Sequence, residues 1–406
     1  DFATALQETD APATVAPAKP APPEKSIAVL PFVNMSADPE NEFFADGITE
    51  EILNALAQIA ELRVAGRTSS FSFKGKNQPL RTIGEELNVR TVLEGSVRRA
   101  GKRVRITAQL IDVTDGYHLW SERYDREIED VFAVQDEIAS TIAGKMKTTL
   151  AGGAASRAQR ATDSIEAYEA YLKGRALLYR RGSSIKPGLA LMEKALSFDP
   201  EYGLAWAGIA DTYSTMGFFG QIPPEIARAK GGEAAANALR FAPDLAESHC
   251  ARAMQLLLFE WDWAGAERAF KRSMELNPGY NQAGAWYHLF YQGYVCDTWD
   301  DALAGVKAYH SRDQRSAYLT TLVAQVYGFG FSEPSAEVWV DRAVTLDPDA
   351  FYTLWARQLF LMSIHDGPRA IEAARTALAA SGRQMASLVV LGLSLVETGD
   401  TAGARA

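Results

Sequence analysis

Five basic side chains crowd into residues 98–105, within the stretch "VLEGSVRRAGKRVRITAQLID" that spans residues 92–112. Such a cluster suits three kinds of chemistry: contact with nucleic-acid phosphates, binding of a smaller anion, or neutralisation by carboxylates inside the fold. Nucleic-acid binding needs a basic face of sizeable area, whereas this chain has a net charge of −10. The stretch also lacks interleaved aromatic side chains on which bases stack. We therefore expect no nucleic-acid binding by this segment.

The same stretch has the alternating pattern of a β-hairpin. If Ala100 and Gly101 form a two-residue turn, the apolar side chains fall on one face and Arg98 lies opposite Arg103 on the other. The apolar face then contains Leu93, Val97, Val104, Ile106, Ala108 and Leu110. The polar face contains Ser96, Arg98, Arg103, Arg105, Thr107 and Gln109.

Directly opposed like charges destabilise a hairpin, so something must compensate for these arginines. Carboxylates can do so, and the candidates are Glu94, Asp112, Glu122 and Asp125. We favour internal neutralisation, because acidic side chains are abundant in the neighbouring sequence. The alternative is a ligand site on this face, in which Ser96, Arg98, Arg103, Arg105 and Gln109 bind an anionic small molecule or an acidic partner.

Sequence motifs of catalytic sites are missing. "KGKNQ" (74–78) lacks the leading glycine and the Ser or Thr of a phosphate-binding loop, and neither HExxH nor GxSxG occurs. The five histidines lack metal-ligand spacing, and Cys250 and Cys296 lie far apart in expected helical segments, where we expect two buried free thiols. Adjacent carboxylates at 49–51 and 126–130 have the pattern of solvated faces. We expect no enzymatic activity, metal or cofactor in these residues.

Residues 1–24 are expected to form a disordered linker. Residues 11–23 contain five Pro and five Ala, and Val15 is their only larger aliphatic side chain. Such a stretch cannot bury enough apolar surface to offset the entropy lost on ordering. Because a linker connects domains, we expect an output domain upstream in the same protein.

Residues 25–150 have the pattern of one α/β domain. An apolar run at 26–32 suits a buried strand, and apolar residues at helical spacing from Phe43 to Ile59 indicate an amphipathic helix. The remaining expected elements are a strand at 62–67, a helix at 80–88, the hairpin, a strand at 118–125 and a helix at 130–149. These elements predict a mixed sheet backed by helices.

Several stretches of this segment carry a family resemblance, in collinear order from residue 26 to about 143. They are "SIAVLPF", "FFADGITEEIL", "GRTSSFSFKGK", the hairpin sequence, "GYHLWSERYDRE" and "VFAVQDEIA". In these stretches the segment resembles the TolB-like domain of bacterial signalling proteins. The resemblance implies a non-catalytic module that often follows a class III nucleotide cyclase domain or a winged-helix DNA-binding domain and then a membrane span. The resemblance does not decide whether this segment lies in the cytoplasm or in the periplasm.

Residues 160–406 have the pattern of helical repeats. Four segments end alike, at Pro200, Pro243, Pro278 and Pro348, with gaps of 43, 35 and 70 residues, the last being twice 35. A period near 34 residues with such endings is typical of tetratricopeptide repeats, whose units are antiparallel helix pairs. "AWAGIADTY" and "DWAGAERAF" also match the repeat pattern. We count about seven units, the last of them truncated, and expect an all-α superhelix.

The resemblance to tetratricopeptide repeats implies a groove lined by the first helix of each unit. Aligning the units assigns Asp211, Thr215, Gln255, Tyr287, Tyr291 and Tyr294 to that groove. The three tyrosines have the spacing i, i+4, i+7 and would share one face of an α-helix. Tyrosine offers a large contact area at low entropy cost, which suits a peptide-binding wall. The alternative is that these tyrosines pack between units.

These features predict a non-enzymatic interaction and sensory module of a multidomain bacterial signalling protein. Its repeats would bind a protein or peptide, and the TolB-like domain would couple binding to the upstream output domain. Two other functions stay open at this point: an anionic-ligand receptor built on the basic hairpin face, and a scaffold that holds a homodimer together. The longest apolar run, at 387–396, is too short for a membrane span.

Overall fold

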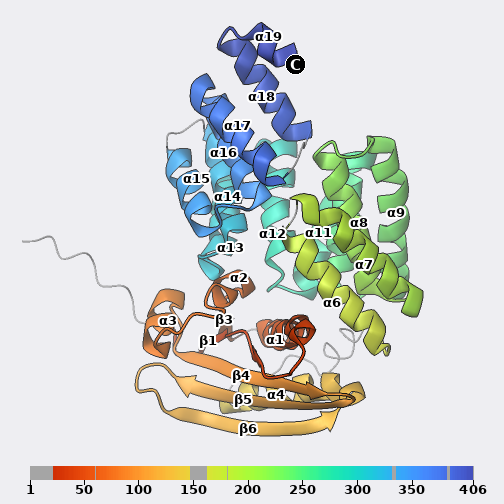
Figure 1. Ribbon diagram of the computed structural model, residues 1–406, viewed down its shortest axis with the longest axis vertical. Helices are drawn as coiled ribbons and strands as arrows, with labels where there is room; N and C mark the ends of the chain where they lie inside the picture. Colours follow the sequence, from red (N-terminus) through yellow and green to blue (C-terminus); the bar gives the residue numbers. More distant parts are fainter. Residues whose placement is uncertain are drawn as a thin grey trace, which may run out of the picture.

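The computed structural model describes residues 22–59, 61–146, 162–180, 182–331, 335–381 and 385–405. It contains a mixed β-sheet with its helices, followed by helices throughout (Figure 1). The predicted fold class, an α/β domain followed by an all-α superhelix, is confirmed. The predicted linker lies outside the described residues except for its last three positions.

The sheet has six strands in the order β3-β1-β4-β5-β6, with β2 paired to β4. Their bounds are β1 Ser26–Val29, β2 Val33–Asn34, β3 Arg63–Val64, β4 Thr91–Ala100, β5 Arg103–Asp112 and β6 His118–Glu127. Strands β1 to β4 pair in parallel, and β4, β5 and β6 are antiparallel. All four residues of β1 are buried, as expected for a short apolar strand inside a parallel region. The sheet is therefore mixed, as predicted.

Helices cover both faces of the parallel part of the sheet. They are α1 Glu42–Ala57, α2 Arg67–Phe71, α3 Leu80–Leu87 and α4 Val131–Lys145. Helices α1 and α4 pack side by side on one face, against Ile27, Val29 and the apolar side of the hairpin. On the other face Ile83 of α3 joins Ala28 and Val92 in a smaller core.

The hairpin turn differs from the prediction by one residue. Ala100 pairs with Arg103, so the turn is Gly101–Lys102, and Gly101 has a φ of +61°. A two-residue turn of this kind needs a positive φ at its first position, which glycine adopts without the strain that Ala100 would suffer there. Arg98 consequently pairs with Arg105 rather than Arg103. Because the register moves by two, both faces keep their predicted residues.

Seven helix pairs follow among the described residues. The first helices are α6 Ile165–Arg180, α8 Gly203–Phe218, α10 Ala246–Gln255, α12 Asn281–Trp286, α14 Ala317–Gln325, α16 Phe351–Ser363 and α18 Met385–Glu397. The second helices are α7 Ile185–Phe198, α9 Pro224–Phe241, α11 Trp263–Leu276, α13 Trp299–Arg312, α15 Ser335–Leu346, α17 Gly367–Ser381 and α19 Thr401–Arg405.

Three consecutive first helices end in π-helical turns. These turns span Leu256–Glu260 after α10, Tyr287–Val295 after α12 and Val326–Phe331 after α14. A π-helical turn contains more residues than an α-helical turn, so side chains beyond it are rotated from their α-helical directions. Sequence spacing alone does not reveal such turns.

The α/β domain and the repeats share one hydrophobic core. This core runs from the sheet through α1 and α4 into α6, α7 and α8, and it includes Tyr168, Tyr171 and Leu172. Figure 1 shows α1 and α2 between the sheet and the repeat helices. The packing is close, because a Cβ added at Gly47 of α1 would lie 2.2 Å from a Leu172 methyl carbon. The domain is thus docked on the repeats.

The expectation for the two cysteines has a structural outcome. Cys250 is buried, as expected, whereas Cys296 is exposed, contrary to the expectation of two buried thiols. Within the described ranges, no helix combines the length and the apolar character that crossing a bilayer requires.

Candidate functional site

A cleft of about 890 Å³ lies between the α/β domain and the inner surface of the repeats. One side is formed by α1, β3 and the start of α2, including Leu53, Asn54 and Gly66. The other side comes from the ends of α6, α12, α14 and α16, including Tyr280 and Tyr352. A cleft of this volume is in the range of ligand-binding sites.

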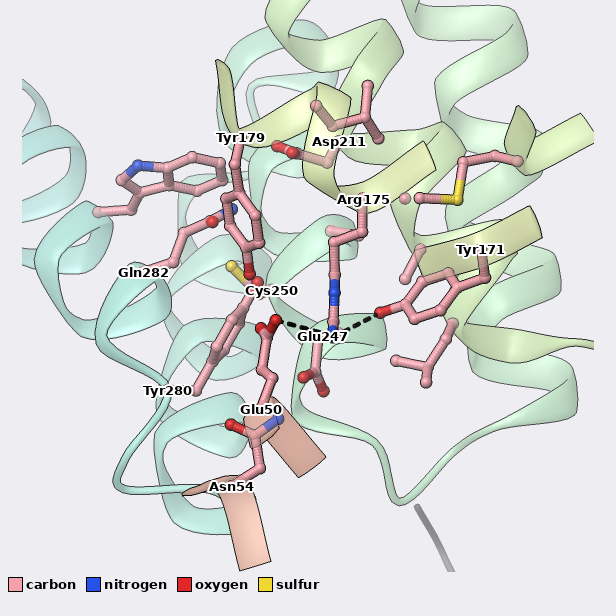
Figure 2. Close-up of a pocket in the computed structure, with 17 residues that line it drawn as sticks. Glu50, Asn54, Tyr171, Arg175, Tyr179, Asp211, Glu247, Cys250, Tyr280 and Gln282 are labelled. Atoms are coloured by element: carbon pink, nitrogen blue, oxygen red, sulfur yellow. Dashed lines mark hydrogen bonds and ion pairs between the residues drawn. The ribbon is translucent and has the colours of Figure 1, made fainter. Parts of the chain in front are cut away.

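The cleft continues into a smaller pocket, of about 90 Å³, which we call the acidic pocket (Figure 2). It is lined by Glu50, Asn54, Tyr171, Arg175, Leu178, Tyr179, Met192, Leu204, Ala207, Gly208, Asp211, Glu247, Cys250, Ala251, Tyr280, Gln282 and Trp286. Its charged side chains are three acids, Glu50, Asp211 and Glu247, and one base, Arg175. Four first helices, α6, α8, α10 and α12, therefore meet α1 here.

Arg175 of α6 joins the two parts of the molecule. Its guanidinium lies 2.9 Å from a carboxylate oxygen of Glu50 and 3.8 Å from one of Glu51, both on α1. It also donates a hydrogen bond to the Tyr171 hydroxyl at 3.1 Å, and Figure 2 shows both the Glu50 and Tyr171 contacts. Arg67 of α2 donates to Glu50 as well, at 2.8 Å. Glu50 is therefore held between two guanidinium groups.

The two neighbouring carboxyl groups of α1, Glu50 and Glu51, have pKa values shifted in opposite directions. Burial alone would raise the pKa of Glu50, but Arg175 and Arg67 outweigh it and hold that pKa below its ordinary value. Burial raises the pKa of Glu51 to about 7, since Arg175 offsets it only in part and Glu50 and Glu247 add negative charge. The expectation that residues 49–51 are a solvated face is wrong, because Thr49 and Glu50 are buried on a helix against which α4 and α6 pack.

A second contact fixes α2 to the middle of the superhelix. The Asp313 carboxylate, in the loop between α13 and α14, accepts a hydrogen bond from the Ser69 backbone N–H at 2.7 Å. The Gly66 N–H donates to the Arg312 carbonyl at 2.9 Å, and the Arg315 N–H donates to the Ser69 hydroxyl at 2.8 Å. The α/β domain thus touches both the first unit and the boundary between the fourth and fifth units.

The other end of the inner surface is apolar. A pocket of about 60 Å³, which we call the aromatic pocket, is lined by Ser214, Thr215, Phe218, Phe219, Met254, Leu258, Trp286, Phe290, Tyr318, Thr321, Leu322, Gln325, Tyr352 and Trp355. None of these lining residues is charged, and they come from α8, α10, α12, α14, α16 and the π-helical turns. Trp286 lines both this pocket and the acidic pocket.

Aromatic contacts join the second unit to the sixth across this end of the groove. The Phe219 ring centroid lies 4.9 Å from that of Phe351 and 5.2 Å from that of Trp355. Phe218 contacts Phe290 and Trp355 in edge-on geometry, at 5.6 and 6.2 Å. Edge-on aromatic pairs are favourable beyond the area they bury. The second and sixth units are therefore in direct contact at this end of the groove.

The predicted groove residues lie in three different places. Asp211 lines the acidic pocket and Thr215 lines the aromatic pocket, one turn further along α8. Gln255 is fully buried between units, where its amide donates to the Ser214 hydroxyl at 2.7 Å. It is therefore part of the packing between α8 and α10.

The three tyrosines do not share one face. Tyr287 and Tyr291 stack at 5.4 Å, and the Tyr291 hydroxyl donates to Glu267 of α11 at 3.0 Å. Tyr294 instead lies against Trp299 and Phe329. All three lie in the π-helical turn 287–295, whose wider turns invalidate the α-helical spacing assumed from sequence. A role of these tyrosines in binding stays a prediction.

On the basic hairpin face, Asp125 of β6 supplies the compensating charge. It lies directly opposite Arg105 and bonds both Arg105 and Arg103, at 2.6 and 3.0 Å. Hydrogen bonds from Arg105 and Arg103 lower the pKa of this carboxyl. Arg98 donates to the Met35 carbonyl, and Ser96 and Gln109 lie opposite Thr107 and Glu94. Anion binding on this face stays a prediction.

Most lining residues of the two pockets were not predicted from sequence. The aromatic residues Trp286, Phe290 and Trp355 sit in first helices, so the repeat pattern was the available signal. For Glu50 and Arg175 the sequence offers no signal, because the two lie on helices of different domains. Within the described part of the chain, no group of three His, Cys, Asp or Glu side chains is placed to hold a metal ion.

Comparisons by sequence identify a family model and a related protein. Residues 23–141 match the family model for the second domain of HilA/YgeH-like transcriptional regulators. A protein of Rhizobium meliloti (strain 1021) named "Putative adenylate cyclase 3" is 47% identical over 196 residues. That match covers 48% of this chain and 32% of the relative, so the chain spans about a third of the relative's length. The family model matches the residues for which we expected a TolB-like domain, and that resemblance stays a prediction.

Solved structures similar to this chain include proteins described as tetratricopeptide repeat proteins. The APC/C hetero-tetramer Cut9-Hcn1 has a TM-score of 0.45 at 16% identity, covering 68% of this chain and 48% of its own. A tetratricopeptide repeat protein from Parabacteroides merdae ATCC 43184 has a TM-score of 0.42 at 14% identity, covering 66% and 96%. These scores are too low to carry an argument about function. The assignment of the repeats rests on the seven helix pairs and on the proline endings of this chain.

Proposed function

We propose that this chain is a non-catalytic interaction module of a larger bacterial signalling protein. Its repeats bind a peptide segment of a protein partner on their inner surface. Its α/β domain, docked across the mouth of that surface, passes the bound state on to an output domain elsewhere in the same protein. The TolB-like resemblance of the α/β domain supports a sensory role rather than a catalytic one.

One observation carries this proposal: the binding cleft is formed by both parts of the chain. Its lining residues come from α1, β3 and α2 on one side and from the first helices on the other. A segment bound there must contact α1, which is anchored to the repeats by Glu50 and Arg175. Binding therefore has a direct physical route to the α/β domain.

The comparisons support two candidates for the output domain. The name of the Rhizobium meliloti relative supports a nucleotide cyclase, and the family model supports a transcriptional regulator. We favour the cyclase, because that match spans 196 residues of this chain, whereas the family model matches 119. Homodimerisation stays a prediction, which the mass of the full chain in solution tests.

The test is a selection of random peptides displayed on phage against the full chain, followed by hydrogen exchange of the chain with a selected peptide. We expect protection on the inner faces of α8, α10 and α14 and altered exchange in α1. Phe290→Ala, in the aromatic pocket, should abolish binding, whereas the matched variant Phe198→Ala, on the exposed side of α7, should not. Enrichment of no peptide, or protection confined to the outer sheet face, would refute the proposal.

A further inference from the structure

Strand β6 forms a long open edge of the sheet. It has ten residues, His118–Glu127, and within the described part of the chain it pairs only with β5. Figure 1 shows it at the end of the sheet that lies away from the repeats. An open strand edge presents unpaired backbone N–H and C=O groups, which are a template for pairing with another strand.

Alternate residues of β6 present their backbone groups on this edge. The Ile128 N–H donates to the Lys102 carbonyl at 2.7 Å, and residues 102 and 128 continue the register in which Arg103 lies opposite Glu127. In an antiparallel pair, residues that bond one neighbouring strand alternate with residues that face away from it. Even-numbered residues of β6 therefore bond β5, and the odd-numbered residues from 121 to 127 direct their backbone groups outward.

Most devices that block a strand edge are missing from β6. The strand contains no proline, and its pairing with β5 is unbroken from Trp120 to Glu127. Seven of its ten side chains are exposed, so no helix or loop of the described ranges covers the edge. Charged side chains are the remaining protection, because they repel other chains. The signs of these charges therefore decide which strand can pair here.

The charges of β6 alternate in sign along the strand. Glu122, Asp125 and Glu127 are acidic, whereas Arg123 and Arg126 are basic. A strand that carries these signs in the opposite order would be attracted along its whole length. Antiparallel pairing reverses the order of residues, so β6 of a second copy of this chain presents the complementary order.

One register satisfies these charges. If a two-fold axis passes through Tyr124, Arg123 lies opposite Asp125 of the second copy. In the same register Glu122 lies opposite Arg126, and symmetry repeats both contacts. Moving the axis to residue 123 or 125 instead places two Arg123 or two Asp125 side chains directly opposite each other, which is destabilising. The register about Tyr124 also aligns the outward-facing residues with one another, which permits about eight backbone hydrogen bonds.

Contacts within the chain leave these side chains accessible to a second copy. Arg126 is 46% exposed and Asp125 is 33% exposed. Glu122 and Arg123 are exposed as well. A carboxylate can accept about four hydrogen bonds, and the two β5 arginines beside Asp125 supply three. Asp125 can therefore accept a further one from Arg123 of the second copy.

We propose that two copies of this chain associate through β6, in antiparallel register about Tyr124, so that their sheets join into one. The same strand serves both copies, so the contact is closed and gives a dimer rather than a chain of molecules. This inference goes beyond the proposed function, because the inner surface of the repeats takes no part in it.

The first measurement is sedimentation equilibrium of the full chain at about 1–100 µM. We expect the mass to approach twice 44.3 kDa as the concentration rises. Arg123→Pro should weaken dimerisation at least about tenfold, because the N–H at residue 123 points away from β5 and proline removes it from the open edge. The control Arg81→Glu, an exposed charge reversal on α3, should leave dimerisation unchanged.

A charge exchange separates this register from misfolding. Glu122→Lys places a lysine opposite Arg126 of the second copy, so this variant alone should be monomeric over the same concentrations. Arg126→Glu places a glutamate opposite Glu122 and should be monomeric too. Mixed in equal amounts, the two variants should form a heterodimer, because each then meets an opposite charge at both positions.

Three outcomes would overturn the inference: a parent chain that stays monomeric up to about 100 µM, a dimer that survives Arg123→Pro, or a mixture of the charge variants without heterodimer. A strand of another protein as the occupant of this edge corresponds to the first of these outcomes. A monomeric parent that binds selected peptides leaves the proposed function standing, whereas a dimer that binds none refutes the proposed function alone.

Discussion

Replacing Arg175 by Met should loosen the docking of the α/β domain on the repeats. The Arg175 side chain is 13% exposed, and its partners Glu50 and Glu51 are 7% and 13% exposed. Removing one member of a buried ion pair costs about 3–5 kcal/mol, because the remaining charge loses its compensation. Here Glu50 keeps Arg67 at 2.8 Å, so we expect a smaller cost, about 2–3 kcal/mol.

The assay is urea unfolding followed by circular dichroism, since the shared core should make docking part of the main transition. Arg81→Met is the matched control, because Arg81 forms an exposed pair with Glu85 on α3, and it should cost no more than about 0.5 kcal/mol. The double variant Glu50→Gln/Arg175→Met should cost less than the sum of the single variants, by about 1–2 kcal/mol. Equal unfolding midpoints for Arg175→Met and Arg81→Met would refute this account of the interface.

Three further predictions follow from individual contacts. The folded chain holds a proton on Glu51 up to about pH 7, whereas the unfolded chain releases it near 4.5, so the free energy of unfolding should fall as pH rises between these values. In urea unfolding, Glu51→Gln should remove this slope and raise the free energy of unfolding by up to about 3 kcal/mol above pH 7. Gly66→Ala puts a Cβ 2.2 Å from Asp313 and should cost about 1–3 kcal/mol, whereas Gly232→Ala in α9, with open space around it, should stabilise by about 0.5–1 kcal/mol in the same assay. Asp125→Asn releases Arg103 and Arg105, so inorganic sulfate should raise the melting temperature of this variant more than that of the parent; equal shifts would remove support for an anion site on the hairpin.

Local sequence patterns predicted the elements and the faces of the fold. The alternation in 92–112 identifies the buried side of the hairpin, and this assignment survives the two-residue shift in register because strand faces have a period of two. The position of the turn needed an additional argument, namely which of Ala100 and Gly101 can adopt a positive φ. The proline endings likewise predicted the repeat units, because a proline beyond the first turn of an α-helix cannot continue it.

The candidate site depended on information that no local pattern contains. Glu50 and Glu51 look solvated on α1, and only the docking of α6 turns them into buried groups around Arg175. The tyrosines at 287–294 were assigned with a period that the π-helical turn does not keep. Of the residues that alignment of the first helices assigned to the groove, Asp211 lines the acidic pocket and Thr215 the aromatic pocket, and their role in binding stays a prediction.

The contacts between the α/β domain and the repeats, which sequence patterns do not predict, are also those that can couple binding to signalling. Arg175 and Asp313 hold the α/β domain at two distant points of the superhelix, the first unit and the boundary of the fourth and fifth units. A ligand that changes the curvature between these points must strain one contact or the other, because α1 and α2 belong to one domain. A ligand shifts such an equilibrium only by its difference in affinity for the two arrangements. Arg175→Met should therefore change peptide affinity as well as stability, whereas Arg81→Met should change neither.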